Sequence, residues 1–421
     1  MKKAIFLFVL VLFGATLFAQ KFDVSAEIRP RFESRHGYKS LIDKDVDGAN
    51  FISQRTRLNF KYQQDKVKFG LTMQNVRVWG DVSTLASADK TSSFHEAWAE
   101  AILSDKLSFK MGRQEIIYDD HRIFGSVGWA QQARSHDAFI AKITPNADNR
   151  IDIGFAMNAD KQGLVGDLYS NAAGYKSFQY VWYHGKFDKL GLSVLLLNTG
   201  IEYPDSTNQK IDFMQTIGPR LTYKSGKFSA NAATYFQTGK KVNKDVSALY
   251  IGAGVNYKAS SSFGVGAAID YLSGKDQDDA SKDIKSFAPL FGTNHKFNGW
   301  MDYFYVGNHF GSVGLMDINA TLSYKKDKLS AKLIPHFFSA PGKITDVNGK
   351  ALDASLGTEV DLTLGYGISK NVKVVAGYSM MFATESMQAL KGGSKDENNS
   401  WGWVMFVFKP KLFSHTAVPT K

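Results

Sequence analysis

The 421-residue chain contains no cysteine, and its 51 Lys and Arg against 40 Asp and Glu give a formal net charge of +11. Without cysteine, thiol catalysis and thiolate metal sites are excluded. The positive excess suits anionic partners, but the basic residues are scattered singly and form no basic run, which argues against nucleic acid.

Residues 1–19 have the organisation of a secretory signal peptide. Lys2 and Lys3 precede an apolar run that ends at the small residue Ala19. The run is short for a membrane anchor, and a strand-like pattern follows it directly. We therefore expect an exported mature chain that starts near Gln20. Without Lys2 and Lys3 its formal net charge is 11 minus 2, or +9. No later segment is apolar for long enough to form a transmembrane helix, which excludes a helical membrane protein.

The mature sequence alternates apolar and polar residues with a period of two. In FDVSAEIRPRFE, residues 22–33, every even position is apolar and every odd position is polar or charged. FISQRTRLNFKY, residues 51–62, repeats this pattern, with Gln54 and Thr56 as polar exceptions on the apolar face. RIDIGFAMN, residues 150–158, repeats it again. A period of two predicts β-strands.

About 18 strands of this kind are predicted, and short turns alternate with long polar stretches between them. The other predicted strands cover residues 67–78, 94–103, 107–117, 132–143, 177–187, 190–197, 213–224, 227–237, 247–258, 262–272, 316–324, 328–338, 356–368, 371–382 and 400–409. The long stretches cover residues 34–50, 80–93, 159–176, 198–212, 273–300, 339–355 and 383–399. Short turns at one end and long loops at the other are typical of an outer-membrane barrel.

A soluble β-sandwich would show the same alternation, so other features decide between the two folds. The export signal, the alternation of turns with loops and the aromatic final strand SWGWVMFVFKP favour the barrel. In a barrel the apolar face meets lipid, the charged face encloses water, and closure satisfies the backbone. We expect an all-β, transmembrane antiparallel β-barrel over residues 20–413, followed by a short tail, 414–421.

Six motifs carry a resemblance to a known family. They are QRTRLNF (54–60), RVWGD (77–81), HEAWAE (95–100), GRQEIIYDDHRIFG (112–125), QQARSHDAF (131–139) and HKFNGWMDYFYV (295–306). With these motifs the sequence resembles the alginate-export family of outer-membrane barrels, over essentially the whole mature chain. The resemblance implies a monomeric channel of about 18 strands, whose arginine-rich pore passes an anionic polysaccharide.

Thirteen residues are candidates for the pore lining or the substrate path. The resemblance assigns to the lumen Arg55, Arg57, Arg77, Glu96, Glu100, Arg113 and Arg134. The polar faces of the predicted strands add Glu27, Arg29, Arg31, Asp152, Glu359 and Asp361.

A hairpin between residues 22–33 and 51–62 would set Glu27 near Arg57, as a salt bridge, and Arg29 near Arg55. A ring of guanidinium groups lowers the energy of a passing carboxylate chain. Alternatively, the charges bond across the lumen and stiffen the barrel. In that case the arginine partners are Glu96, Glu100, Glu359 and Asp361.

Three functions are compatible with these features. The first is a channel in the outer membrane of a Gram-negative bacterium for anionic saccharides such as an alginate-like polyuronate. The second is a general diffusion porin for small hydrophilic solutes. The third is a barrel enzyme, for which Ser135 beside His136 is the only candidate catalytic pair. Neighbours in a strand face opposite sides, so we expect no enzyme. The expected partners are outer-membrane lipid, lipopolysaccharide and the anionic saccharide.

Two loops carry further expectations. Asp43, Asp45 and Asp47 have the spacing of a calcium loop, although Gln54 stands where a bidentate glutamate is needed. Bound calcium and a solvated acidic loop are therefore both open, and no other cofactor is expected. The longest connection, 273–300, is either an inward-folded constriction or a surface loop.

Overall fold

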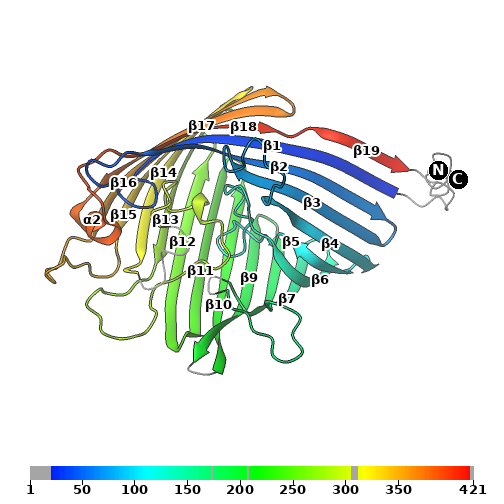
Figure 1. Ribbon diagram of the computed structural model, residues 1–421, viewed down its shortest axis with the longest axis horizontal. Coiled ribbons are helices and arrows are strands. Elements are labelled where there is room, and N and C mark those ends of the chain that lie inside the picture. Colours follow the sequence, from blue (N-terminus) through cyan, green and yellow to red (C-terminus); the bar gives the residue numbers. More distant parts are fainter. Residues whose placement is uncertain (1–19, 172–173, 206–207, 305–311, 418–421) are drawn as a thin grey trace.

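The computed structural model describes residues 20–171, 174–205, 208–304 and 312–417. The expected signal peptide, residues 1–19, lies outside these residues. The strands form one antiparallel sheet (Figure 1). In chain order they are β1 (Gln20–His36), β2 (Ala49–Gln64), β3 (Val67–Val78), β4 (Ser92–Ser104), β5 (Leu107–Gln114), β6 (His136–Asn146), β7 (Asn149–Met157), β8 (Ser177–Phe187), β9 (Leu190–Asp205), β10 (Asn208–Ser225), β11 (Phe228–Lys241), β12 (Lys244–Tyr257), β13 (Phe263–Leu272), β14 (Leu315–Lys326), β15 (Leu329–Ser339), β16 (Ser355–Ser369), β17 (Val372–Ala383), β18 (Asn399–Phe408) and β19 (Lys411–Ala417).

The sheet closes into a barrel because β1 has hydrogen-bonded partners on both edges. On one edge it pairs with β2, and on the other with β18 and β19. β18 and β19 are two pieces of one strand, interrupted at Lys409 and Pro410, and the carbonyl of Pro410 still accepts a hydrogen bond from the Ala26 N–H (3.0 Å). Counted in this way, the described residues make a closed barrel of 18 strands, as expected.

The last strand extends further than the sequence predicts. Residues 414–417, expected as part of a tail, continue β19 along the first residues of β1, where Ala417 lies opposite Gln20 (Figure 1). The segment KLFSHTA shows no clean alternation. Its strand conformation comes instead from the backbone edge that β1 offers.

Alternate side chains point to opposite sides of the barrel wall, as the period of two requires. In β1, Ile28 and Phe32 are 43% and 42% exposed, whereas Arg29 and Arg31 between them are 7% and 4% exposed. The apolar positions therefore form the outer, lipid-facing surface and the charged positions face inward. Closure of this ring leaves no long sheet edge in the bilayer.

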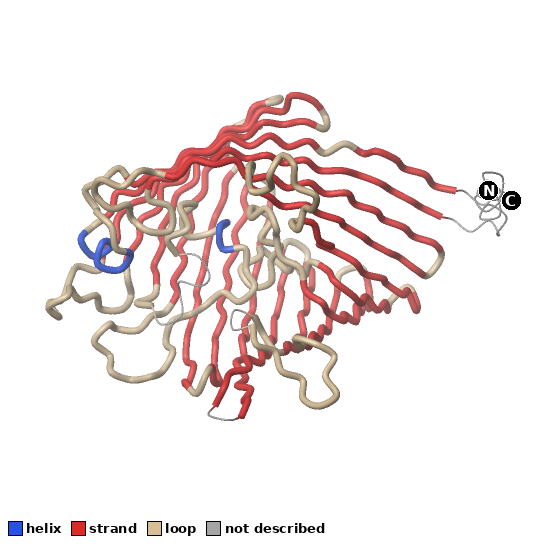
Figure 2. The backbone as a smooth tube through the Cα atoms, in the orientation of Figure 1, coloured by secondary structure: helices blue, strands red, loops and turns tan. Residues whose placement is uncertain are grey.

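The lumen is crossed by two loops that fold inward (Figure 2). The first, residues 115–135, joins β5 to β6, and we call it the strap. The second joins β13 to β14, and we call its described residues, 273–304 and 312–314, the crossing loop. The crossing loop contains a helical turn, η1 (Asn294–Lys296), and a short helix, α2 (Glu385–Lys391), precedes β18. Neither of these two described helices has the length or the apolar content to span a bilayer.

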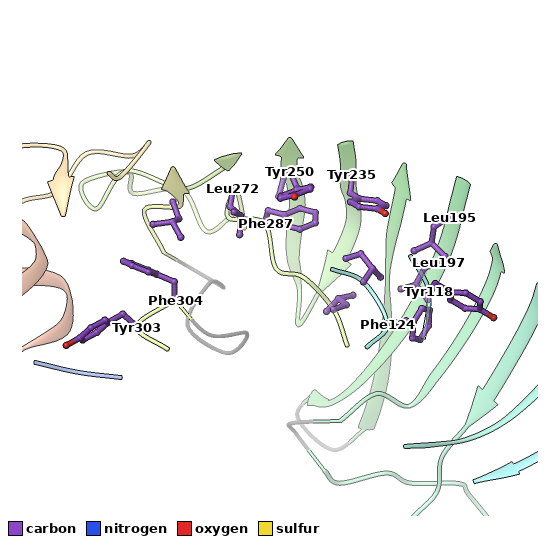
Figure 3. Packing of buried hydrophobic residues seen from close by; sticks show 14 of the residues in the cluster. Tyr118, Phe124, Leu195, Leu197, Tyr235, Tyr250, Leu272, Phe287, Tyr303 and Phe304 are labelled. Carbon is purple, nitrogen blue, oxygen red and sulfur yellow. The ribbon is translucent and has the colours of Figure 1, made fainter. Parts of the chain in front are cut away.

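Apolar side chains also fill part of the interior (Figure 3). Phe124 of the strap packs against Tyr180 of β8, with ring centroids 5.0 Å apart, and Phe287 of the crossing loop packs against Tyr250 of β12 at 5.5 Å. The inward faces of β8–β12 are therefore largely apolar and aromatic, while the inward faces of β1 and β2 are rich in arginine. The lumen is asymmetric in its chemistry.

Candidate functional site

Three inward-facing arginines of β1 and β2, Arg29, Arg31 and Arg55, form what we call the arginine ladder. The predicted register is confirmed, because Arg29 lies opposite Arg55 and Glu27 opposite Arg57. The predicted ion pair is wrong, however. Glu27 binds its diagonal neighbour Arg55 (2.5 Å), since long side chains reach across the diagonal of an antiparallel pair. Arg57 turns instead toward β3, where its Nε donates to Gln74 (3.1 Å).

The arginine ladder holds the backbone of the strap. Arg29 donates to the carbonyl oxygens of Gly128 (2.7 Å) and Trp129 (3.0 Å), and Arg31 also donates to Trp129 O (2.8 Å). Arg31 has a carboxylate partner in Glu33 (2.8 Å). Arg29 is 7% exposed and has no carboxylate within salt-bridge distance in the described part of the chain. Its guanidinium is therefore held by carbonyl and amide oxygens of the strap rather than by a directly bonded carboxylate.

The opposite end of the strap is fixed to β10 and β13. The guanidinium of Arg122 is buried, forms an ion pair with Asp270 of β13 (2.6 Å) and donates to Asn298 of the crossing loop (3.0 Å). Asp120 pairs with Arg220 of β10 (3.2 Å). Burial raises the pKa of Asp120, but Arg220 and Arg122 together lower it below its usual value. The strap, whose first part is the motif GRQEIIYDDHRIFG, thus spans the lumen from β1 and β2 to β10 and β13.

The crossing loop rests on acids of β16. The N–H groups of Met301 and Trp300 donate to Glu359 (2.8 Å) and Asp361 (3.1 Å). At Gly299, where φ is +81°, a Cβ would lie 2.6 Å from a carboxylate oxygen of Glu359, so glycine allows this close approach. Glu359 and Asp361, expected in the pore lining, are 0% exposed and anchor a loop.

The strap and the crossing loop form one continuous layer, which we call the constriction. The Gly125 N–H donates to Phe291 O (2.7 Å), and Arg134 of the strap donates to Gly292 O (3.0 Å). The ring of Trp129 stacks on His295 with centroids 4.5 Å apart. Of the two expectations for residues 273–300, the inward-folded constriction is therefore the one observed.

The remaining candidate acids have local partners. Glu100 binds Lys142 (3.1 Å), and Glu96 accepts the N–H of Glu115 (3.2 Å). Asp152 pairs with Arg150 (2.6 Å). None of these described carboxylates is the partner of the arginine ladder, so the expected set of cross-lumen partners is wrong. The partners of the ladder are acids of β1 and carbonyls of the strap.

Arg113 and Arg77 lie on the outer face, which corrects their assignment to the lumen. Arg113 shares the face of Met111, which is 61% exposed, and pairs with Asp137 (2.8 Å). Arg77 lies opposite the outward-facing Gln54 and contacts Asp89. Both arginines stand near the loop end of their strands, where a lipid-facing surface gives way to polar headgroups and water.

We expect Arg113→Ala to leave the charge selectivity of the protein unchanged and to alter the free energy of unfolding by less than about 1 kcal/mol. The reason is that the side chains of Arg113 and Asp137 are 43% and 61% exposed. Reversal potential in a salt gradient and urea unfolding in lipid vesicles measure the two effects. A shift in reversal potential would return Arg113 to the lumen.

The calcium site is not formed. Asp43, Asp45 and Asp47 are all exposed, and no group of three or more His, Asp or Glu side chains in the described chain is arranged to hold a metal. The three carboxylates belong to a solvated turn, where the positive φ of Asp45 (+61°) directs the chain back toward β2.

Comparison with known proteins gives a consistent result. A family profile described as "Alginate export" matches residues 20–400. The fold matches Pseudomonas aeruginosa OccK9 (OpdG) at 12% identity with a TM-score of 0.62, covering 93% of this chain and 98% of that one. Acinetobacter baumannii OccAB1 matches at 11% identity with a TM-score of 0.62, covering 93% and 97%. P. aeruginosa OccK2 (OpdF) in complex with glucuronate matches at 12% identity with a TM-score of 0.59, covering 93% and 98%. No curated protein sequence gave a match.

Proposed function

The chain belongs to the alginate export family of outer-membrane β-barrel channels, and on that premise we propose that it passes anionic saccharides along the wall formed by β1, β2, β18 and β19. It is a transport channel rather than an enzyme. What the proposal adds is the chemistry of the cargo, a chain of sugar acids such as a polyuronate, and the route that it takes.

The observation that carries the proposal is a track of cations along this wall. Nine cationic side chains have the inward parity of β1 and β2 or follow β18, against the three acids Asp23, Glu27 and Glu33. The cations are Lys21, Arg29, Arg31, Arg35, Arg55, Arg57, Lys61, Lys409 and Lys411. Such an excess of cations lowers the energy of a carboxylate all along the wall. No single site binds the carboxylate tightly, and passage through a channel requires this.

The track extends to the turn end of the barrel. There Lys409 pairs with Glu27 (2.8 Å) and Lys411 with Asp23 (3.2 Å), around a cavity of about 440 Å³ that Lys61 also lines. These pairs are partly exposed, so a passing carboxylate can exchange with the protein carboxylates at modest cost. The glucuronate bound by OccK2 is a sugar acid, which supports this class of cargo for a channel of the same fold.

Planar-bilayer recording tests the proposal. In a tenfold salt gradient, we expect a reversal potential of the sign that favours anions, and we expect oligouronates to interrupt the current more strongly than neutral oligosaccharides of equal length. A reversal potential near zero, together with equal passage of neutral sugars, would instead establish a general diffusion porin.

A further inference from the structure

A cavity of about 460 Å³ lies between the strap and the loop end of the barrel. We call it the vestibule pocket. Its walls are the ends of β1, β2 and β3, and its floor is Val127 and residues 129–132 of the strap, with His295 and Asp302 of the crossing loop. The volume falls within the range of roughly 300–1,000 Å³ that is usual for pockets that bind small molecules. The side chains that matter for recognition are Arg31, Arg35, Tyr38, Lys39, Phe51 and Gln132.

Arg35 is held rigidly in the wall of this pocket. Its guanidinium carbon lies 4.2 Å from the ring centroid of Tyr38 and 4.7 Å from that of Phe51, so the group is sandwiched between two aromatic faces. Its Nε and Nη2 donate to the same oxygen of Glu33 (3.0 and 2.8 Å). Nη1 has no hydrogen-bond partner in the described chain, and the side chain is 32% exposed. A preoriented guanidinium edge is therefore available to a ligand.

The floor of the pocket is aromatic and cationic. The guanidinium of Arg31 lies 3.9 Å above the ring of Trp129, and the same ring stacks on His295 at 4.5 Å. Tyr38 donates to Asp302, which also accepts from His295 (2.8 Å). These contacts fix the floor and exclude water from its apolar faces, so a ligand meets a preformed surface rather than a mobile one.

The combination of groups selects a particular ligand chemistry. The open edge of Arg35 matches a carboxylate, for which guanidinium is the preferred partner. Gln132 and Asp81 line the same space and offer hydrogen-bonding groups to hydroxyls. The charged side chains of the pocket balance, with Arg31 and Lys39 beside Arg35 against Glu33, Asp81 and Asp302, because the Arg77 side chain lies on the outer face. The selection for a carboxylate therefore comes from the open edge of Arg35.

We propose that the vestibule pocket is a binding subsite for one or two units of a sugar acid, whose carboxylate is held by Arg35 at the loop end of the channel. The proposal rests on the proposed function and deepens it, because it gives the channel a defined docking position on the extracellular side of the constriction. A saccharide that occupies this position lies directly above the arginine ladder. It blocks ion flow while it is bound.

The test is single-channel recording with a diuronic acid added only to the loop side. We expect discrete current blocks in the wild-type protein, and in Arg35→Gln we expect the residence time to fall at least about tenfold, the loss expected for one hydrogen bond to a charged group. Arg35→Lys keeps the charge but not the planar fork, and its residence time should lie between the two. Arg113→Gln on the outer face is the matched control and should behave as wild type.

Each outcome separates this inference from the proposed function. Equal residence times in wild type and Arg35→Gln, or equal block by a neutral disaccharide, would overturn the vestibule pocket as a subsite while the anion-favouring reversal potential persists. Loss of that reversal potential in the wild-type protein would instead overturn the channel's cargo class. Heat-modifiable migration on gels verifies that each variant has folded. Phe51→Leu removes one of the two aromatic rings that sandwich Arg35, and we expect it to shorten the current blocks independently.

Discussion

Replacing Arg122 with alanine is expected to lower the free energy of unfolding by about 3–5 kcal/mol, the cost of breaking a buried ion pair from one side. The substitution leaves Asp270 charged within the barrel interior, where the hydroxyl of Tyr250 (2.6 Å) is the one remaining donor to it among the described residues. It also removes the donor to Asn298. Urea unfolding in lipid vesicles, followed by tryptophan fluorescence, measures the change.

The double variant Arg122→Met with Asp270→Leu provides the control. Because both charges are removed together, the interior keeps its volume and contains no isolated carboxylate, so most of the lost stability should return. Arg122→Ala alone should also raise the single-channel conductance, since the strap loses its attachment to β13. A stability within about 1 kcal/mol of wild type would show that the pair does not fix the strap.

The barrel wall could be predicted from the sequence because the determinant is local. Each strand has one face toward lipid and one toward the lumen, so the period of two is present in the residues themselves. The register of β1 on β2 followed from the same parity, and it placed Arg29 opposite Arg55 correctly. What the backbone register does not determine is which long side chain reaches which partner, so the ion pair of Glu27 was assigned to the wrong arginine.

The interior of the barrel could be predicted much less well, because its contacts join segments far apart in the chain. The expected strands 107–117 and 132–143 included both ends of the strap, whereas the structure ends β5 at Gln114 and begins β6 at His136. One signal was present in β9, where the run VLLL has no polar alternation. Leu195 and Leu197 are buried inside the barrel, while Leu196 is 46% exposed on its outer surface. A strand that is apolar on both faces implies that something apolar covers its inner face.

The two arginines misplaced into the lumen show a different limit. A family motif transfers the type of residue, whereas the face on which it lies depends on parity. Arg113 has the parity of Phe109 and Met111, both apolar and exposed, so the sequence already contained the evidence for the outer face. Arg77 likewise has the parity of the exposed Met73, which places it on the outer face.

The second large effect is expected at the arginine ladder. Changing Arg29 and Arg55 together to serine should reduce the anion preference of the channel to near unity, because the central cations of the track disappear. The carbonyl of Gly128 would then lose its guanidinium donors, at about 1–3 kcal/mol, and the carbonyl of Trp129 would keep Arg31 but lose Arg29, so the strap should move and raise the conductance. Reversal potential and single-channel conductance measure the two effects separately.

Lysine at the same two positions separates charge from geometry. An ammonium group retains the positive charge but cannot reproduce the fork by which Arg29 bridges two neighbouring carbonyls (2.7 and 3.0 Å). The lysine variant should therefore keep the anion preference and show a higher conductance than wild type. The serine variant should lose the anion preference and also show the higher conductance. If both variants keep wild-type conductance, the remaining contacts of the strap, with Arg31, Asp270 and the crossing loop, are sufficient to hold it. If the serine variant keeps its anion preference, the cations that select the cargo lie elsewhere on the track, at Arg35 or Lys409.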